Sequence, residues 1–184
     1  MKVVPCSDKS LEEVAATLSA GGVAVIPTDT VYGLAAHPSF PEAVERLYSI
    51  KGREKRKKIA LLASDAAAVG AFIGCAMPRK ACELAERHWP GALTMVVGGE
   101  GFRVPAHAWT RRLIAACGGV LRVTSANLSG GQPATDAPQA LEDVGLSADV
   151  VVDDGPSPVG VPSTVVSVGD AGEIVVLRQG AISV

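Results

Sequence analysis

Residues 26–36 read IPTDTVYGLAA, and the polarity of the chain changes twice within this short stretch. The residues just before it complete an apolar run, VAVI at 23–26, that ends at Pro27. Three polar residues, TDT at 28–30, come next, and apolar residues resume at Val31. A short apolar run that ends in turn-forming residues is typical of a buried strand. The stretch therefore predicts a buried strand followed by a polar loop.

The same alternation of apolar strands and polar punctuation continues along the whole chain. Segments rich in β-branched residues predict strands at 59–63, 92–97, 120–124, 148–153, 163–168 and 173–177. Apolar residues at helical spacing predict helices near 11–20, 41–51, 65–72, 79–88, 109–117 and 138–144. Ser10 with Glu13, and Ser39 with Glu42, have the spacing of capping boxes at the first two helix starts. Interleaved strands and helices predict an α/β fold, a twisted mixed or parallel sheet flanked by helices with a concave ligand cleft.

Length and composition narrow the class of protein. The 184 residues can bury one substantial core, so we expect a single domain over residues 1–184. The 48% of hydrophobic and 20% of charged residues exclude a disordered chain. No apolar run approaches the roughly 20 residues of a membrane helix, and no export signal is visible. We therefore expect a soluble cytoplasmic protein without a membrane partner.

The cysteines and histidines do not predict a metal site. The cysteines lie at 6, 75, 82 and 117 and the histidines at 37, 88 and 107, without zinc-ligand spacing. We expect reduced, packed thiols and no protein-held metal ion.

Three polar loops are candidates for ligand contact, because loops at strand ends carry function in sheets of this kind. PTDT at 27–30 could hold a zwitterion or a phosphate, or could only satisfy nearby backbone groups. KGREKRKK at 51–58 could bind a polyanion such as ATP or RNA, or could be a solvated charged loop. TSANLSGGQPA at 124–134 gathers hydroxyl and amide groups, and ordinary turn chemistry explains that clustering poorly.

Several common nucleotide and catalytic motifs are absent from the sequence. It contains no G-x-x-x-x-G-K-[ST], no G-x-G-x-x-G, no G-x-S-x-G and no D-F-G. A nucleotide site, if present, is therefore not a P-loop, Rossmann or kinase site. The residues alone lead to an α/β protein in which an anion site is one open hypothesis.

Six separated blocks resemble one known family. They are PTDTVYGL (27–34), K-x-R (51–53), WPGALT (89–94), SANLSG (125–130), STVV (163–166) and VLRQG (176–180). In this order they resemble the YrdC/TsaC family of threonylcarbamoyl-AMP synthases, and the chain is similar to the short form without the extra carboxyl-terminal domain.

The resemblance implies a reaction. L-threonine, bicarbonate and ATP would give threonylcarbamoyl-AMP and pyrophosphate, with Mg²⁺ expected beside the ATP. The product would supply the threonylcarbamoyl group of a tRNA adenosine, through a downstream tRNA threonylcarbamoyl-transfer complex. Because the threonine carbamate is already an anionic nucleophile, orientation and charge neutralisation would suffice for its attack on the α-phosphate.

The resemblance also implies roles for single residues. The catalytic set would be Lys51, Arg53, Ser125 and Asn127. The threonine-binding residues would be Thr30 and Ser163, and the ATP-binding residues would be Arg53, Lys57, Thr94, Ser125 and Arg178. The polar interruption at 28–30 would then be one wall of an amino-acid pocket. Arg178 looks suited to a phosphate or ribose because it is an unpaired arginine near the chain end.

The sequence departs from the family pattern in three places. Glu54 and Lys58 stand where the family commonly has prolines, so the loop at 51–58 could be more mobile. The block RVPAHAW keeps Arg103 but lacks a second proline. Ala134 stands where relatives often carry serine, so one nucleotide contact could be missing or supplied by Thr135.

Two other functions remain as alternatives. The basic stretch could belong to a non-catalytic module that binds tRNA or double-stranded RNA, although acidic residues outnumber basic ones and aromatic residues are only 4%. The same fold could also make a carbamoyl adenylate for another acceptor.

Overall fold

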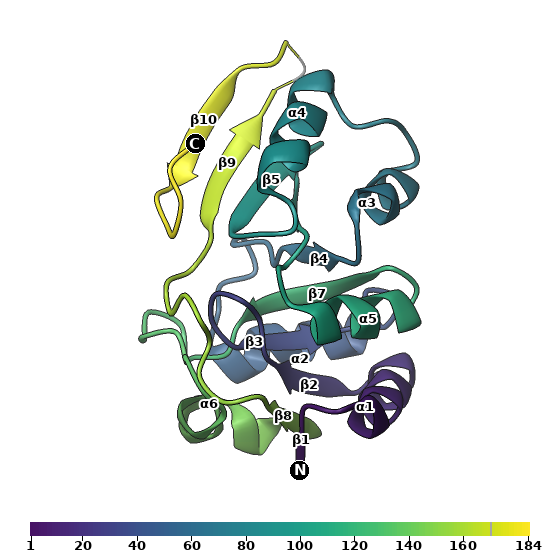
Figure 1. Ribbon diagram of the computed structural model, residues 1–184. Coiled ribbons are helices and arrows are strands. Elements are labelled where there is room, and N and C mark those ends of the chain that lie inside the picture. The colour runs from purple at the N-terminus through teal and green to yellow at the C-terminus, as the bar shows by residue number, and fades with distance from the viewer. Residues whose placement is uncertain (170) are drawn as a thin grey trace.

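A computed structural model describes residues 1–169 and 171–184 and contains one sheet of ten strands (Figure 1). The strands are β1 Lys2–Pro5, β2 Val23–Ile26, β3 Gly33–Ala36, β4 Leu61–Ala63, β5 Leu93–Val97, β6 Glu100–Arg103, β7 Val120–Ser125, β8 Val150–Asp153, β9 Thr164–Val168 and β10 Ile174–Arg178. The helices are α1 Asp8–Ser19, α2 Pro41–Lys51, α3 Ala66–Ile73, α4 Arg79–His88, α5 Ala108–Ala116 and α6 Ala137–Asp143, with a 3₁₀ turn η1 at Gly145–Ser147.

The sheet is mixed, and its strand order is β1-β8-β2-β3-β7-β4-β6-β5-β9-β10. Strand β8 runs parallel to β1 and β2, β4 runs parallel to β6, and β5 runs parallel to β9. The other neighbouring pairs are antiparallel. The predicted α/β class with helices on a twisted mixed sheet is confirmed.

Helices cover both faces of the half of the sheet that contains the amino terminus (Figure 1). In β2, Ala24 and Ile26 pack with α1 and α5, while Val23 and Val25 pack with α2 and α6. Both faces of the strand are therefore removed from water. This explains why VAVI at 23–26 is continuously apolar rather than alternating.

In the other half of the sheet, β5 buries only alternate side chains beneath α4. Leu93, Met95 and Val97 pack with Leu84 and its neighbours in the core cluster. Thr94 and Val96 point to the opposite face, where they line a pocket. The alternation of a strand with one covered face thus directs polar side chains into the pocket.

The structure corrects the predicted helix starts. Helix α1 begins at Asp8 and is capped by Ser7, whose side chain accepts from the Ser10 backbone N–H. Ser10 is therefore the N3 residue of the capping box, not its N-cap residue. Helix α2 begins at Pro41, and its N-cap residue Phe40 makes no side-chain cap. The predicted start of α1 was wrong because the capping residue is Ser7, three residues before Ser10. The predicted start of α2 was wrong because Pro41, with its fixed φ, begins the helix without a side-chain cap.

Three strands were not predicted from the sequence, namely β1, β3 and β6. Strand β3 contains only Gly, Leu and Ala, and β6 reads EGFR, so neither has the β-branched enrichment that marks a strand. Their pairing partners decide their conformation, because β3 joins β2 to β7 and β6 joins β4 to β5. Of the described residues, none belongs to a helix long and apolar enough to cross a membrane.

Candidate functional site

A pocket of about 640 Å³ lies on the sheet face that α4 does not cover. Its walls come from the loop after β2, the basic loop after α2, strands β5 and β6, the loop after β7, the start of β9 and the end of β10. The polar and charged lining residues are Thr28, Thr30, Tyr32, Arg53, Arg56, Lys58, Thr94, Arg103, Thr124, Ser125, Asn127, Ser163 and Arg178. The three loops selected from the sequence therefore meet at one pocket. Its use as a ligand cleft stays a prediction.

A buried ion pair fixes the wall formed by the loop at 27–30. Arg103 Nη2 lies 2.5 Å from Asp29 Oδ1, and the two side chains are only 7% and 9% exposed. Arg103 also donates from Nε to the Gly91 carbonyl at 2.8 Å and from Nη1 to Thr30 Oγ1 at 2.7 Å. A buried arginine with every side of its guanidinium engaged holds its neighbours in one arrangement. Asp29 thus balances the charge of Arg103.

These bonds set the direction of the Thr30 hydroxyl. Thr30 Oγ1 accepts from Arg103, so its own hydrogen can only be donated. Thr28 Oγ1 lies 3.1 Å away, donates its own hydrogen to the Val31 carbonyl and accepts from two backbone N–H groups. Thr30 is therefore the donor between the two hydroxyls, and an acceptor atom that enters the pocket would compete with Thr28 for the Thr30 hydrogen. This end of the pocket is built to meet a carboxylate or carbonyl oxygen rather than an ammonium group.

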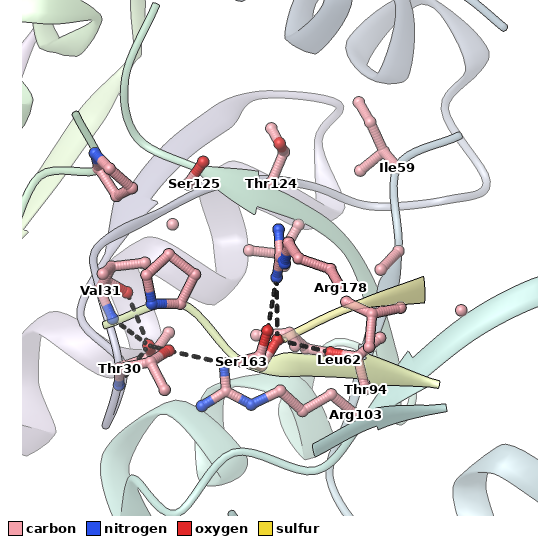
Figure 2. Close-up of a pocket in the computed structure, with 18 of the residues that line it drawn as sticks. Thr30, Val31, Ile59, Leu62, Thr94, Arg103, Thr124, Ser125, Ser163 and Arg178 are labelled. Atoms are coloured by element: carbon pink, nitrogen blue, oxygen red, sulfur yellow. Dashed lines mark hydrogen bonds between the residues drawn. The ribbon is translucent and has the colours of Figure 1, made fainter. Parts of the chain in front are cut away.

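A second hydroxyl pair joins strand β5 to Ser163, the residue before β9. Thr94 Oγ1 and Ser163 Oγ lie 2.8 Å apart, and both residues are buried. Arg178 Nη2 donates to the Ser163 carbonyl at 2.7 Å, and Figure 2 shows its guanidinium directed toward Ser163. Strand β10 lies beside β9 and brings the guanidinium to this carbonyl, while Arg178 makes no ion pair with an acidic side chain among the described residues. One Nη of Arg178 is thus held, and the pocket receives a positioned positive charge.

Lys51 lies beneath the loop at 125–131 and is only 3% exposed. Its ammonium donates to the Ser125 carbonyl at 2.5 Å, the Asn127 carbonyl at 2.6 Å and Asn127 Oδ1 at 3.2 Å. Burial and the nearby charge of Arg53 lower the pKa of Lys51 to about 8. Lys51 is not among the pocket-lining residues, and its three protons are used to shape the loop.

The loop at 125–131 presents one free hydroxyl to the pocket. The Asn127 amide donates to the Leu128 and Gly131 carbonyls, which closes the loop on itself. Ser125 Oγ lies 3.5 Å from Lys51 Nζ and makes no closer bond within the described residues. Ser125 and Asn127 both line the pocket. The Ser125 hydroxyl therefore remains able to bind a ligand.

The basic loop contributes Arg53, Arg56 and Lys58 to the pocket lining, but not Lys57. Arg53 donates from Nε to the Lys57 carbonyl at 2.8 Å and from Nη2 to the Lys58 carbonyl at 3.2 Å, which fixes the turn. The Lys57 ammonium lies 3.8 Å from Glu54, and the Lys57 side chain is 53% exposed. The structure thus brings together every predicted site residue except Lys57 and the underlying Lys51.

Sequence reasoning missed several lining residues. The sequence indicated Arg56 and Lys58 only as members of the basic stretch at 51–58, and Arg103 only as the arginine kept in the block RVPAHAW, as the resemblance implies. The motif RVP signalled Arg103, but its partner Asp29 lies far away in the sequence, so only the fold reveals the pair. Ala134 is buried in the core and the Thr135 hydroxyl donates to Gln139, and neither lines the pocket.

The charge of the lining is uniformly positive. Five cationic side chains line the pocket, and no Asp or Glu does so within residues 1–169 and 171–184; the cations are Arg53, Arg56, Lys58, Arg103 and Arg178. The described part of the chain also contains no cluster of His, Cys, Asp or Glu that could hold a metal ion. This donor set does not suit a protein-held Mg²⁺, which prefers carboxylate ligands. It fits a polyanion that brings its own magnesium.

Comparisons with known proteins identify the family of this chain. The sequence profile of the Sua5/YciO/YrdC family, described as telomere recombination, matches residues 16–180. The threonylcarbamoyl-AMP synthase of Bacillus subtilis is 35% identical over 96% of this chain and 55% of its own length. The chain thus spans about half the length of that relative. The threonylcarbamoyl-AMP synthase of Alkalilimnicola ehrlichii is 34% identical over 91% of this chain and 94% of its own length.

A solved structure shows the same fold. P. abyssi Sua5, crystallised in complex with L-threonine, superimposes with a TM-score of 0.87 at 27% identity. The match covers 98% of this chain and 58% of that one. With the family profile over most of its length and relatives above 30% identity, this chain belongs to the Sua5/YciO/YrdC family.

Proposed function

We propose that this chain is a threonylcarbamoyl-AMP synthase, which converts ATP, L-threonine and bicarbonate to threonylcarbamoyl-AMP and pyrophosphate. The observation that carries the proposal is a single pocket with two kinds of wall. One wall presents cations without a lining carboxylate, and the other presents buried hydroxyl groups of fixed direction. The names of the bacterial relatives support the same activity.

The hydroxyl wall would receive the amino acid. Thr30 would donate its hydrogen to a carboxylate oxygen of threonine, because Arg103 already occupies one acceptor site on the Thr30 hydroxyl. Ser163, the residue before β9, would contact the same substrate. Asp29 keeps Arg103 neutralised, so the carboxylate would be bound by oriented hydrogen bonds rather than by a free charge.

The cationic wall would receive the triphosphate. Arg53, Arg56, Lys58 and Arg178 would spread positive charge along the phosphates, while Thr94 and Ser125 would hydrogen-bond the nucleotide. Lys57 would add a weaker, more distant charge. A magnesium ion would arrive on ATP as part of the substrate and neutralise further phosphate charge.

The reaction would then need positioning more than acid–base chemistry. Bicarbonate and the threonine amine give a carbamate and water; a carbamate oxygen attacks the α-phosphorus, and the bond to pyrophosphate breaks. Ser125 and Asn127 would hold the reacting groups, and Lys51 would keep their loop in place from below. Fixed cations near the reacting phosphate stabilise the charge that develops there.

The product would pass to a tRNA threonylcarbamoyl-transfer complex in the cytoplasm. Direct contact of this chain with tRNA or double-stranded RNA is a separate possibility, and the cations that line the pocket are equally compatible with a nucleotide. Tight tRNA binding that weakens steeply with salt, in the absence of ATP turnover, would favour the RNA-binding alternative.

The test is pyrophosphate release by the purified chain. We expect release from ATP only when threonine and bicarbonate are both present, and mass spectrometry should detect threonylcarbamoyl-AMP. Omission of either substrate is the internal control. Release with serine or carbamoyl phosphate but not with threonine would instead assign a relative that uses another acceptor.

A further inference from the structure

A second cavity, of about 410 Å³, is separate from the pocket described above. Arg103 lines the first pocket and the next residue, Val104, lines the second, and no residue lines both. The cavity lies among the amino end of α3, the helix α4 and the helix α5. Its lining residues are Ser64, Asp65, Ala66, Met77, Cys82, Ala85, Glu86, Trp89, Pro90, Val104 and Arg111. Its volume lies within the range of small-molecule sites, roughly 300–1,000 Å³.

The floor of this cavity is apolar and rigid. Ala85 and Val104 are buried core residues, and Met77 and Trp89 pack against the same clusters. The Trp89 indole N–H donates to the Leu93 carbonyl at 2.7 Å, which fixes the ring. The polar edge of Trp89 is therefore occupied. The floor suits an apolar group, such as an aromatic or branched aliphatic side chain.

One cation in the lining lacks an acceptor. Arg111 Nε is buried and has no hydrogen-bond partner, and no ion pair or side-chain hydrogen bond joins the Arg111 guanidinium to another described residue. By contrast, the neighbouring Arg112 pairs with Asp8 at 2.8 Å. The buried Nε is closed to a ligand, but the two terminal Nη groups are not buried and make no bond within the described residues, so they can donate to an incoming carboxylate.

Two carboxylates line the same cavity. Asp65 is engaged, because Oδ1 accepts from the Ala68 N–H at 2.8 Å and Oδ2 accepts from Ser64 Oγ at 3.3 Å. Glu86 is exposed and has no ion-pair or hydrogen-bond partner among the residues that the structure describes. A simple anion would be attracted by Arg111 and repelled by both carboxylates. A zwitterion would complement both signs of charge.

We propose that this second cavity binds an apolar α-amino acid, or a small molecule with the same carboxylate, ammonium and apolar groups. Arg111 binds the carboxylate, Glu86 binds the ammonium group, and Met77, Trp89 and Val104 contact the apolar side chain. The proposal does not depend on the activity proposed for the first pocket, because the two sites share no lining residue.

The test uses L-phenylalanine as the probe and nuclear magnetic resonance of the ¹⁵N-labelled full chain as the readout. The sequence contains two tryptophans, Trp89 in the cavity and Trp109, whose indole N–H donates to the Ser7 carbonyl away from it. We expect a saturable shift of the Trp89 indole signal and none of the Trp109 signal. The amide signals of Gly33 and Gly101, which line the first pocket, report binding there instead.

Matched ligands and variants separate the contributions. Arg111→Gln and Glu86→Gln should each weaken binding at least about tenfold, whereas Arg112→Gln should leave it unchanged. Arg111→Lys, which keeps the charge, should weaken binding less than Arg111→Gln. Hydrocinnamate, without the ammonium group, and phenethylamine, without the carboxylate, should each bind at least about tenfold more weakly than L-phenylalanine.

Three results would overturn the proposal. They are an unshifted Trp89 signal up to the solubility limit of L-phenylalanine, equal affinity in the folded Arg111→Gln variant, and equal affinity for hydrocinnamate. The dispersion of the amide spectrum shows whether each variant is folded. If Arg111→Gln does not fold, the Glu86→Gln variant and the two truncated ligands still decide the question.

Discussion

The two walls of the first pocket are built in opposite ways. On the hydroxyl wall, Arg103 and Asp29 form an ion pair with side chains 7% and 9% exposed, and Thr30 is bonded to that pair. On the cationic wall, Arg56 pairs with Glu54 at the surface, with side chains 80% and 52% exposed. The Arg103–Asp29 pair is fixed before any ligand arrives, whereas Arg56 and Glu54 keep their charges in water.

The difference follows from what each wall would have to recognise. Surface ion pairs are worth at most about 1 kcal/mol, so the charges around Glu54 can change partner at little cost. A buried pair loses several kcal/mol when one partner is removed, so Arg103 and Asp29 cannot rearrange. A small amino acid requires hydrogen bonds of fixed direction, whereas a triphosphate mainly requires positive charge. The following predictions test this contrast between a fixed wall and an adaptable wall.

The largest expected effect is on stability at the fixed wall. Arg103→Met should lower the free energy of unfolding by about 3–5 kcal/mol, because Asp29 would remain buried without a partner. Urea unfolding measures the change. Arg56→Met is the matched control and should leave the free energy of unfolding nearly unchanged, because its pair with Glu54 is exposed to water. A loss below about 1 kcal/mol for Arg103→Met would remove the distinction between the two walls.

The next effect is on turnover at the cationic wall. Arg53→Ala should lower the rate of pyrophosphate release by at least about 100-fold, since it removes a positive charge beside the reacting phosphate. Lys55→Ala is the control, because Lys55 pairs with Glu45 at 2.8 Å and does not line the pocket. Near wild-type rates for Arg53→Ala would show that the wall only attracts ATP.

The sequence alone predicts those parts of the fold and of the pocket that depend on local residue patterns. The alternation of strands and helices and the three polar loops were predicted, because periodicity and turn chemistry are local properties. The pairing of Arg103 with Asp29 was not predicted, because their positions meet only when β6 lies in the same sheet as β2. The structural place of Lys51 was missed for the same reason, since its acceptors lie on the distant loop at 125–131.

The pH dependence should show how Lys51 supports the cationic wall. Because its pKa is lowered to about 8, Lys51 loses its proton as the pH rises through about 8, and turnover should fall by up to about tenfold per pH unit above that value. The effect of Lys51 on the free energy of unfolding changes with pH in the opposite direction to its effect on turnover. Between about pH 8 and 10.5 the unfolded chain binds more protons at this lysine, so its contribution to stability rises with pH.

Two measurements separate these effects of Lys51. The pH–rate profile should follow an ionisation near pH 8 while the free energy of unfolding does not fall over the same range. In Lys51→Arg the ionisation should disappear from the profile, since arginine stays protonated. A profile that persists in that variant would assign the ionisation to another group.

A smaller effect is expected at the Thr30 hydroxyl. Thr30→Val keeps the shape but removes the donated hydrogen, so the KM for threonine should rise about tenfold with little change in the KM for ATP. Thr30→Ser retains the hydroxyl and should stay within about threefold of wild type. If Thr30→Val and Thr30→Ser had the same KM for threonine, the hydrogen bond donated by Thr30 would not contribute to recognition of threonine.

The smallest effect is expected for Lys57, the predicted ATP residue that lies outside the pocket lining. Its side chain is 53% exposed and its ammonium lies 3.8 Å from Glu54, so its charge would reach the phosphates only through water. Lys57→Ala should raise the KM for ATP by at most about threefold, and the difference from wild type should vanish at high salt because exposed charges are screened. A salt-independent increase above about tenfold would mean that Lys57 turns inward and contacts ATP directly, and the adaptable wall would then include the whole loop at 53–58.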